Sequence, residues 1–194
     1  MSLIYCHRCT LPLANCVCQL APKIVLPKPC TLLFHPREYS KRSNTGRLLK
    51  IATNVQSATW HRLKNHEQAD QFKQHVLLYP PDISAMDNQD TSQTLPQDHS
   101  NIAGFIIIDA TWQESRKMLR QSPWLAELPR MSLQPLSSQY SLRRNQQNQG
   151  MSTLETMSQW LFEQNQRNSA QELLNFLQNF QSVYLQAQQA GLLI

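Results

Sequence analysis

The sequence lacks any apolar run long enough to cross a bilayer, and its N-terminus lacks the apolar core of a secretory signal peptide. We therefore expect a cytoplasmic protein with no membrane partner. At 194 residues, 41% of them hydrophobic, the chain is long enough to bury one core and to carry a small appendage.

Acidic residues are scarce in two segments. Residues 1–50 contain eight Lys or Arg and one acid, and residues 111–150 contain six and two. Residues 51–110 reverse the balance with three bases and seven acids, so the net charge of +5 understates the segregation. Concentrated positive charge favours a polyanionic partner, nucleic acid first, because neutralising phosphates releases counterions. A basic surface without a partner is the alternative.

Cysteine is absent after residue 30, and four of the five cysteines lie within the first eighteen residues. In a chain without a secretion signal, such a cluster favours metal binding over disulfides. A Cys-x-x-Cys pair and a Cys-x-Cys pair can surround a tetrahedral Zn²⁺ and order a segment too short for its own core. A reduced thiol cluster or a redox pair is the alternative. The expected ligands are Cys6, Cys9, Cys16 and Cys18.

The stretch over 104–119 is the most informative in the chain. The apolar run Gly104-Phe-Ile-Ile-Ile ends abruptly at Asp109, and a helical pattern starts immediately after it. A buried parallel strand delivers a polar residue in this way to the carboxyl edge of a sheet, where α/β proteins place their ligands. Thr111 is the expected N-cap. The following helix carries a basic face of Gln113, Arg116, Lys117 and Arg120.

Other patterns complete an α/β chain. We expect further strands over 31–34, 57–61, 75–79 and 130–133, a surface loop over 82–101, and a last helix with Leu173, Leu177, Phe180 and Tyr184 on one stripe. Prolines over 19–30 indicate a connector. We therefore expect a cysteine knuckle and connector over 1–30 and a catalytic domain over 31–194.

Two helix starts are candidate ligand sites. Ser43 or Asn44 is expected to cap a helix after a polar, basic loop, and such a loop can bind an anion through backbone N–H groups. Its sequence is not a Walker or dinucleotide motif, and an ordinary capped helix is the alternative. Ser152 and Glu155 match a capping box, which competes with a ligand role for these residues.

Taken together, these segments resemble the DTW-domain family. The matching features occur in the family's order and cover most of residues 5–160. Ala110 stands where glycine is usual in the family, and Ser115 where alanine is usual. Besides the cysteine knuckle, the motifs are His35-Pro36-Arg37-Glu38, Ser43-Asn44-Thr45-Gly46-Arg47-Leu48, Asp109-Ala110-Thr111-Trp112 with Arg116-Lys117-Met118, Tyr140-Ser141-Leu142-Arg143, and Ser152-Thr153 with Glu155.

The resemblance implies a tRNA-uridine aminocarboxypropyltransferase. Such enzymes use S-adenosylmethionine and transfer its 3-amino-3-carboxypropyl group to the ring imide nitrogen of a uridine, releasing methylthioadenosine. The resemblance also implies a SPOUT-like fold, a mostly parallel sheet flanked by helices with a knotted C-terminal part. It leaves the choice between monomer and dimer open.

Residue roles follow from this resemblance. Asp109, with Thr111 and Trp112, is the expected catalytic group: its carboxylate either accepts the imide proton or holds the donor's amino group. Trp112 either stacks on a base or belongs to the core. The expected cofactor-binding residues are Ser43, Asn44, Thr45, Gly46, Asp109, Ser152, Thr153 and Glu155. The expected tRNA contacts are Arg37, Arg47, Arg116, Lys117, Arg143 and Arg144.

Two other functions fit the same residues. A SPOUT-type RNA methyltransferase would use the same donor and transfer a different carbon. A zinc-knuckle RNA-binding module without catalysis would need only the cysteines and the basic residues.

Overall fold

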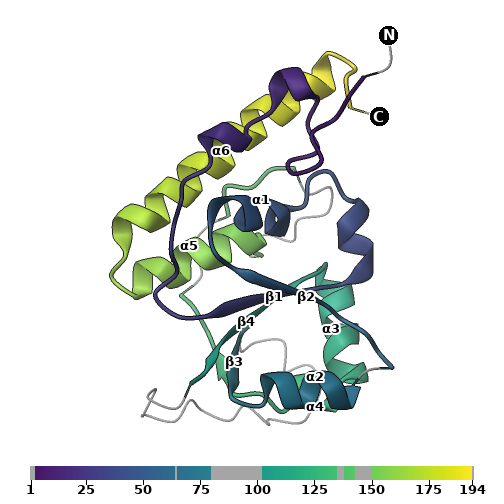
Figure 1. Ribbon diagram of the computed structural model, residues 1–194, viewed down its shortest axis with the longest axis vertical. Coiled ribbons are helices and arrows are strands. Elements are labelled where there is room, and N and C mark those ends of the chain that lie inside the picture. Colours follow the sequence, from purple (N-terminus) through teal and green to yellow (C-terminus); the bar gives the residue numbers. More distant parts are fainter. Residues whose placement is uncertain (1–2, 64, 80–101, 135–137, 143–149, 194) are drawn as a thin grey trace. The chain divides into compact units, whose positions relative to one another are not determined.

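The computed structural model describes residues 3–63, 65–79, 102–134, 138–142 and 150–193 (Figure 1). The chain divides into two compact units built from interleaved segments. We call Met1–Leu26, Ser40–Asn54 and Gln134–Ile194 the knuckle unit, and Pro27–Tyr39 and Val55–Leu133 the sheet unit. The expected domain division at residue 30 stays a prediction.

The sheet unit contains a five-stranded sheet in which all pairings are parallel. This confirms the expected parallel α/β architecture. The strand order is β2-β1-β4-β3-β5, so the strand that ends at Asp109 is central. The strands are β1 (Cys30–Phe34), β2 (Gln56–Thr59), β3 (His75–Leu78), β4 (Gly104–Asp109) and β5 (Arg130–Met131).

The sequence of β4 explains its central place. A central parallel strand is covered on both faces, so it needs apolar side chains at successive positions. Phe105, Ile106 and Ile107 are all buried, and the β-branched residues favour an extended backbone. Gly104 fits at the strand's start because a Cβ there would lie 2.9 Å from the carbonyl oxygen of Pro29.

Three helices cover one core of this unit. They are α2 (Asn65–Phe72), α3 (Trp112–Gln121) and α4 (Pro123–Ala126), and Figure 1 shows all three labelled near the sheet. Phe72, Met118 and Leu125 from these helices pack with Leu33, Leu77 and Ile106 from the strands. Pro123 occupies the first position of α4, where its missing N–H costs no hydrogen bond.

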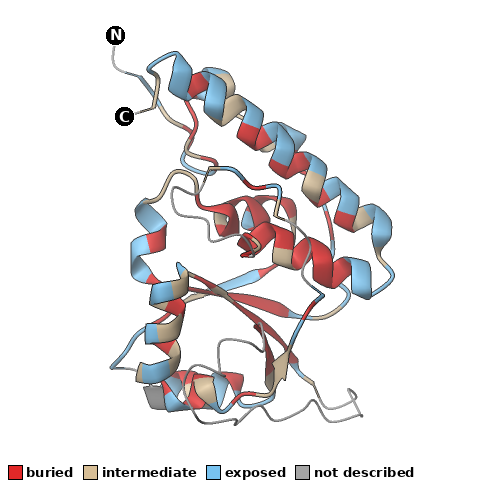
Figure 2. Ribbon diagram, turned by 180° about the vertical axis from the view of Figure 1, so that it is seen from behind, coloured by how far each residue is buried: buried red, intermediate tan, exposed pale blue. Residues whose placement is uncertain are grey.

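The knuckle unit contains α1 (Thr45–Ala52), α5 (Thr153–Glu163) and α6 (Arg167–Gln189), which pack together. Its core includes Leu49, Trp160 and Phe176. The predicted stripe on α6 is confirmed, since Leu173, Leu177 and Phe180 are buried and Tyr184 is half-buried. Figure 2 shows buried and exposed faces along α6.

A glutamine of α6 holds the backbone of the segment over 139–141. Gln181 is buried, and its side-chain oxygen accepts the backbone N–H of Ser141 at 2.8 Å while its amide donates to the carbonyl of Gln139.

Short 3₁₀ helices lie at η1 (Leu13–Asn15), η2 (Cys18–Leu20) and η3 (Pro36–Ser40).

None of the helices in the described part of the chain combines the length and the apolar composition that a bilayer crossing requires.

Candidate functional site

Asp109 lies where the sequence predicted, at the carboxyl end of β4. The residue is 1% exposed, and it pairs in register with Phe34 of β1. Its carbonyl accepts the backbone N–H of His35 at 3.0 Å. Polar residues therefore follow two adjacent parallel strands at the same sheet edge, which is the usual position of ligand sites in α/β proteins.

Thr111 begins α3 with a complete capping box. Its hydroxyl oxygen accepts the backbone N–H of Glu114, while Glu114 Oε2 accepts the Thr111 backbone N–H at 3.1 Å and its hydroxyl at 2.7 Å. The predicted N-cap is confirmed, and Glu114 is the partner that the sequence analysis did not identify.

The second oxygen of Glu114 faces His35. Glu114 Oε1 lies 3.5 Å from His35 Nδ1 and 4.0 Å from Arg37 Nη1. Burial lowers the pKa of His35, and the negative charge of Glu114 opposes that shift. The edge therefore holds a shielded imidazole beside the carboxylate of Glu114, and Asp109 lies at the same edge.

Trp112 and Ser115 connect this edge to the core. Trp112 packs against the core and meets the Tyr79 ring edge-on at 5.9 Å, so the structure gives it a packing role, and base stacking stays a prediction. Ser115 shares a hydrogen bond of 3.0 Å with the Tyr79 hydroxyl, which gives the buried tyrosine a polar partner. Burial raises the pKa of Tyr79.

The expected RNA-binding cations differ in exposure. Arg37 has a side chain that is 78% exposed, and Lys117 is also exposed, whereas Arg116 is half-buried. On α3 the polar outer face that its periodicity predicted carries the exposed side chains of Gln113, Lys117 and Arg120. Arg143 and Arg144 lie outside the described residues.

In the knuckle unit, Asn44 caps α1. Its side-chain oxygen accepts the backbone N–H of Arg47 at 2.8 Å, which decides between the two caps that the sequence left open. Thr45 is 2% exposed, and its hydroxyl has no hydrogen-bond partner within the described ranges. A buried hydroxyl without a partner is costly, so this atom fits a site that a polar ligand completes.

The start of α5 is a second complete capping box. Ser152 accepts the backbone N–H of Glu155, whose Oε2 accepts the Ser152 backbone N–H at 2.7 Å. The other oxygen, Oε1, accepts the backbone N–H groups of Gln139 and Tyr140 at 2.7 and 3.1 Å. Both carboxylate oxygens thus hold the protein's own backbone, which gives Glu155 a structural role; its role toward a cofactor stays a prediction.

Tyr140 links the two helix starts. Its backbone N–H donates to Glu155 in the first turn of α5, and its hydroxyl donates to the carbonyl of Ser43 just before α1. The residue is 1% exposed. Tyr140 therefore connects the two helix starts that carry the candidate cofactor residues of the knuckle unit: Ser43, Asn44, Thr45, Gly46, Ser152, Thr153 and Glu155.

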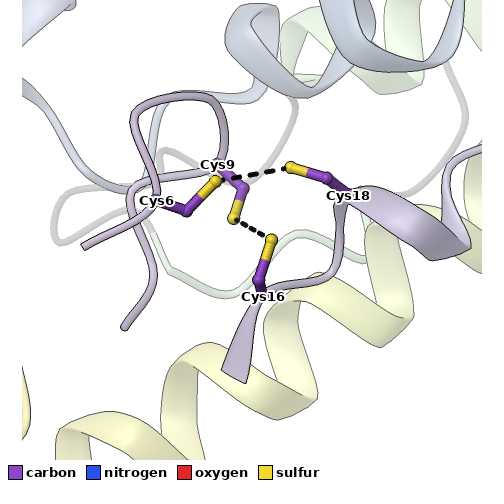
Figure 3. Close-up of side chains that lie close together, drawn as sticks. All are labelled: Cys6, Cys9, Cys16 and Cys18. Atoms are coloured by element: carbon purple, nitrogen blue, oxygen red, sulfur yellow. Dashed lines mark hydrogen bonds between the residues drawn. The ribbon is translucent and has the colours of Figure 1, made fainter. Parts of the chain in front are cut away.

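The four N-terminal cysteines converge on one point (Figure 3). Their Sγ atoms all lie within 4.8 Å of one another, with Cys6 and Cys18 at 3.7 Å and Cys9 and Cys16 at 3.8 Å. A tetrahedral zinc ion with Zn–S bonds of about 2.3 Å holds its sulfurs about 3.8 Å apart. The donor set and its spacing therefore fit zinc, and the cysteines are free thiols rather than disulfides.

Backbone hydrogen bonds hold the loop that carries Cys6 and Cys9. Cys6 N–H donates to Leu11 at 2.8 Å, and Thr10 N–H donates to the Cys6 carbonyl at 2.9 Å with Thr10 in the left-handed region at φ 63°. Burial raises the pKa of Cys6, but N–H groups of Cys9 and Arg8 and neighbouring thiols outweigh it and bring the pKa down to about 6. The exposed His7 does not join the cluster.

Sequence reasoning missed three positions that the structure places in these networks. His35 and Tyr140 lie in motifs of the sequence but had no predicted role, and Glu114 had none either. The spacing Thr111-x-x-Glu114 is itself the signal of a capping box, and it was available in the sequence. The approach of Glu114 to His35 was not, because it depends on the pairing of β1 with β4.

Comparison with known proteins supplies the family. Residues 3–185 match the family described as the DTW domain. A tRNA-uridine aminocarboxypropyltransferase 2 from Drosophila melanogaster is 26% identical over 165 residues, which cover 80% of this chain and 64% of that protein. The chain thus spans less than two thirds of the relative's length. No solved structure matches the chain. Because the family match covers nearly the whole sequence, the chain belongs to the DTW-domain family.

Proposed function

We propose that the protein transfers the 3-amino-3-carboxypropyl group of S-adenosylmethionine to the ring imide nitrogen of a uridine in tRNA and releases methylthioadenosine. The observation that carries the proposal is the match to a relative named as a tRNA-uridine aminocarboxypropyltransferase. The buried carboxylate of Asp109 at a carboxyl sheet edge supports it chemically.

Asp109 has two roles compatible with this reaction. The uracil imide is weakly acidic, so its attack benefits from a group that removes the proton. The donor is a cation with an ammonium group, so its binding benefits from a buried carboxylate. Thr111 and Trp112 are proposed to keep Asp109 and the start of α3 in place.

The knuckle unit is proposed to hold the donor's amino acid end. Support comes from the buried Thr45 hydroxyl and from the helix starts at Asn44 and Ser152, whose backbone N–H groups suit a carboxylate. The remaining proposed contacts are Ser43, Gly46, Thr153 and Glu155. Bound S-adenosylmethionine supplies the electrophilic carbon, and these residues orient it.

Zinc and tRNA have separate proposed sites. Cys6, Cys9, Cys16 and Cys18 are proposed to hold Zn²⁺, which stabilises the knuckle and takes no part in the reaction. The proposed tRNA phosphate contacts are Arg37, Arg47, Arg116, Lys117, Arg143 and Arg144. A cytoplasmic location follows from the proposed substrate. The all-parallel sheet agrees with the proposed SPOUT-like fold, and tracing of an experimental structure tests the proposed knot.

To test the proposal, the protein is incubated with unmodified tRNA and S-adenosylmethionine, the tRNA is digested, and the nucleosides are analysed by mass spectrometry. We expect a uridine heavier by an aminocarboxypropyl group. A methylated nucleoside would favour the methyltransferase, and tRNA binding without any product would favour the RNA-binding module.

Asp109→Asn should lower the rate of product formation by about 100-fold or more without weakening tRNA binding. Asp70→Asn is the matched control, because Asp70 is an exposed acid of α2 in the same unit. An Asp109→Asn variant that forms product at the wild-type rate would remove Asp109 from the site.

A further inference from the structure

We propose that His35 is the base that accepts the uridine imide proton and that Glu114 is the carboxylate that positions it. This inference rests on the transfer reaction proposed above and chooses between the two roles of Asp109. It is carried by the contacts of the His35 ring at the sheet edge.

His35 is held at the sheet edge where β4 ends in Asp109. It directly follows β1, and its backbone N–H donates to the Asp109 carbonyl at 3.0 Å. The imidazole stacks on Trp60 with centroids 5.6 Å apart, and Trp60 Nε1–H in turn donates to Ser122 Oγ at 2.8 Å. A proton acceptor held by its neighbours loses little entropy when a substrate arrives.

Nδ1 of His35 has a partner in each protonation state. The Arg37 backbone N–H lies 3.3 Å from it and suits a bare nitrogen, whereas Glu114 Oε1 at 3.5 Å suits a protonated one. With the proton on Nδ1 and Glu114 as its acceptor, Nε2 carries the lone pair that takes a further proton. The imidazolium so formed keeps the negative charge of Glu114 beside it. In the Ser-His-Asp triad a carboxylate stabilises the imidazolium of the catalytic histidine in the same way.

Charges from two elements act on the ring. Glu114 and Lys117 of α3 and Arg37 and Glu38 of η3 influence His35; the two acids raise its pKa and the two cations lower it. Burial outweighs the acids, so the pKa lies below the ordinary value of 6.5. His35 is therefore neutral near neutral pH, which is the state that accepts a proton.

The proposed step balances. The imide N–H bond breaks and its proton moves to His35 Nε2, and the nitrogen's electron pair forms a bond to the donor's methylene carbon. The carbon–sulfur bond breaks, and its electron pair remains on sulfur in neutral methylthioadenosine. Asp109, released from the role of base, would then be the carboxylate that stabilises binding of the cationic donor.

Single-turnover rates against pH test this in the wild type, His35→Gln, Glu114→Gln and the control His61→Gln. Glutamine at 114 keeps an oxygen for the Thr111 cap, and His61 is an exposed histidine of the same unit. We expect His35→Gln to slow the reaction by about 100-fold or more. Glu114→Gln should move the acidic limb of the profile to lower pH, since the charge that raises the His35 pKa is gone.

A second readout needs no catalysis. The titration of His35 followed by ¹⁵N NMR should have its midpoint at lower pH in Glu114→Gln than in the wild type, and an unchanged titration would overturn the role of Glu114. If the wild type forms the product and His35→Gln reacts within about threefold of the wild-type rate, the base role is overturned and the proposed function stays intact. No product from the wild type would instead contradict the proposed function itself.

Discussion

Two histidines of the sheet unit, His35 and His75, are shielded from water. Because burial lowers their pKa values, the free energy of unfolding depends on pH. Burial lowers the pKa of His35, which stacks on Trp60, and of His75, which meets the Phe72 ring edge-on at 5.2 Å. The folded state therefore favours neutral imidazole more than the unfolded chain does, so the unfolded chain binds more protons in the window below the ordinary value.

The folded protein should accordingly lose stability as the pH falls below about 6.5, the unfolded value for histidine. The contribution is fully present above that pH and is lost as the pH falls through the lowered folded-state values. Urea midpoints measured at about pH 7.5 and about pH 5.5 should differ, and the difference should shrink in His35→Gln.

His61→Gln provides the comparison, because His61 is exposed. Its midpoints should keep the wild-type difference between the two pH values. An equal reduction in both variants would mean that burial of His35 does not control this pH dependence.

At the scale of elements, the apolar runs predicted β1 and β4 well, because buried parallel strands need consecutive apolar residues. The boundaries of β2 were less accurate. It was expected over 57–61, but the strand is Gln56–Thr59, and its last ladder contact is the Trp60 N–H to the Phe34 carbonyl at 2.8 Å. Strand ends depend on such partners, which the local sequence does not encode.

The candidate site was predictable where it is local. The caps at Asn44, Thr111 and Ser152 lie within three residues of their partners, and their motifs are visible in the sequence. The link through Tyr140 and the approach of Glu114 to His35 join segments far apart in the chain. Those contacts follow from tertiary structure, so sequence patterns alone did not reveal them.

The cysteine knuckle is an element whose order should depend on its metal. Cys9→Ser removes one of four ligands and should lower bound zinc to a small fraction of the wild-type amount, because a structural zinc site needs its full tetrahedral set. Elemental analysis of the purified variant measures this directly.

Cys30→Ser is the matched control. Cys30 lies in β1, is 2% exposed, and burial raises the pKa of its thiol to about 12, so it stays protonated. Zinc content should be unchanged in this variant. Loss of zinc from Cys30→Ser, or full zinc in Cys9→Ser, would contradict the assignment of the ligands.

At the scale of the whole molecule, the segregated charge predicts how tRNA binding responds to salt. Each phosphate neutralised by a cation adds about 0.7 to 0.9 to the slope of log affinity against log salt. Joint replacement of Arg116 and Lys117 by alanine should therefore flatten the slope by about 1 to 2 and weaken binding.

Lys73→Ala tests whether the effect belongs to α3. Lys73 is exposed and lies in the acidic segment over 51–110. Its removal should leave the slope almost unchanged. If Lys73→Ala flattened the slope half as much as the double variant does, in proportion to the charge removed, only the net charge would matter. An unchanged slope in the double variant would mean that α3 does not contact the RNA.

The most direct test of the whole account is the co-product released from S-adenosylmethionine during reaction with unmodified tRNA. Transfer of the aminocarboxypropyl group leaves methylthioadenosine, in an amount equal to the modified uridine. Transfer of the methyl group would leave S-adenosylhomocysteine instead. We predict methylthioadenosine, formed by the wild type and by Asp70→Asn but not by Asp109→Asn. S-adenosylhomocysteine, or equal methylthioadenosine from Asp109→Asn, would contradict the account.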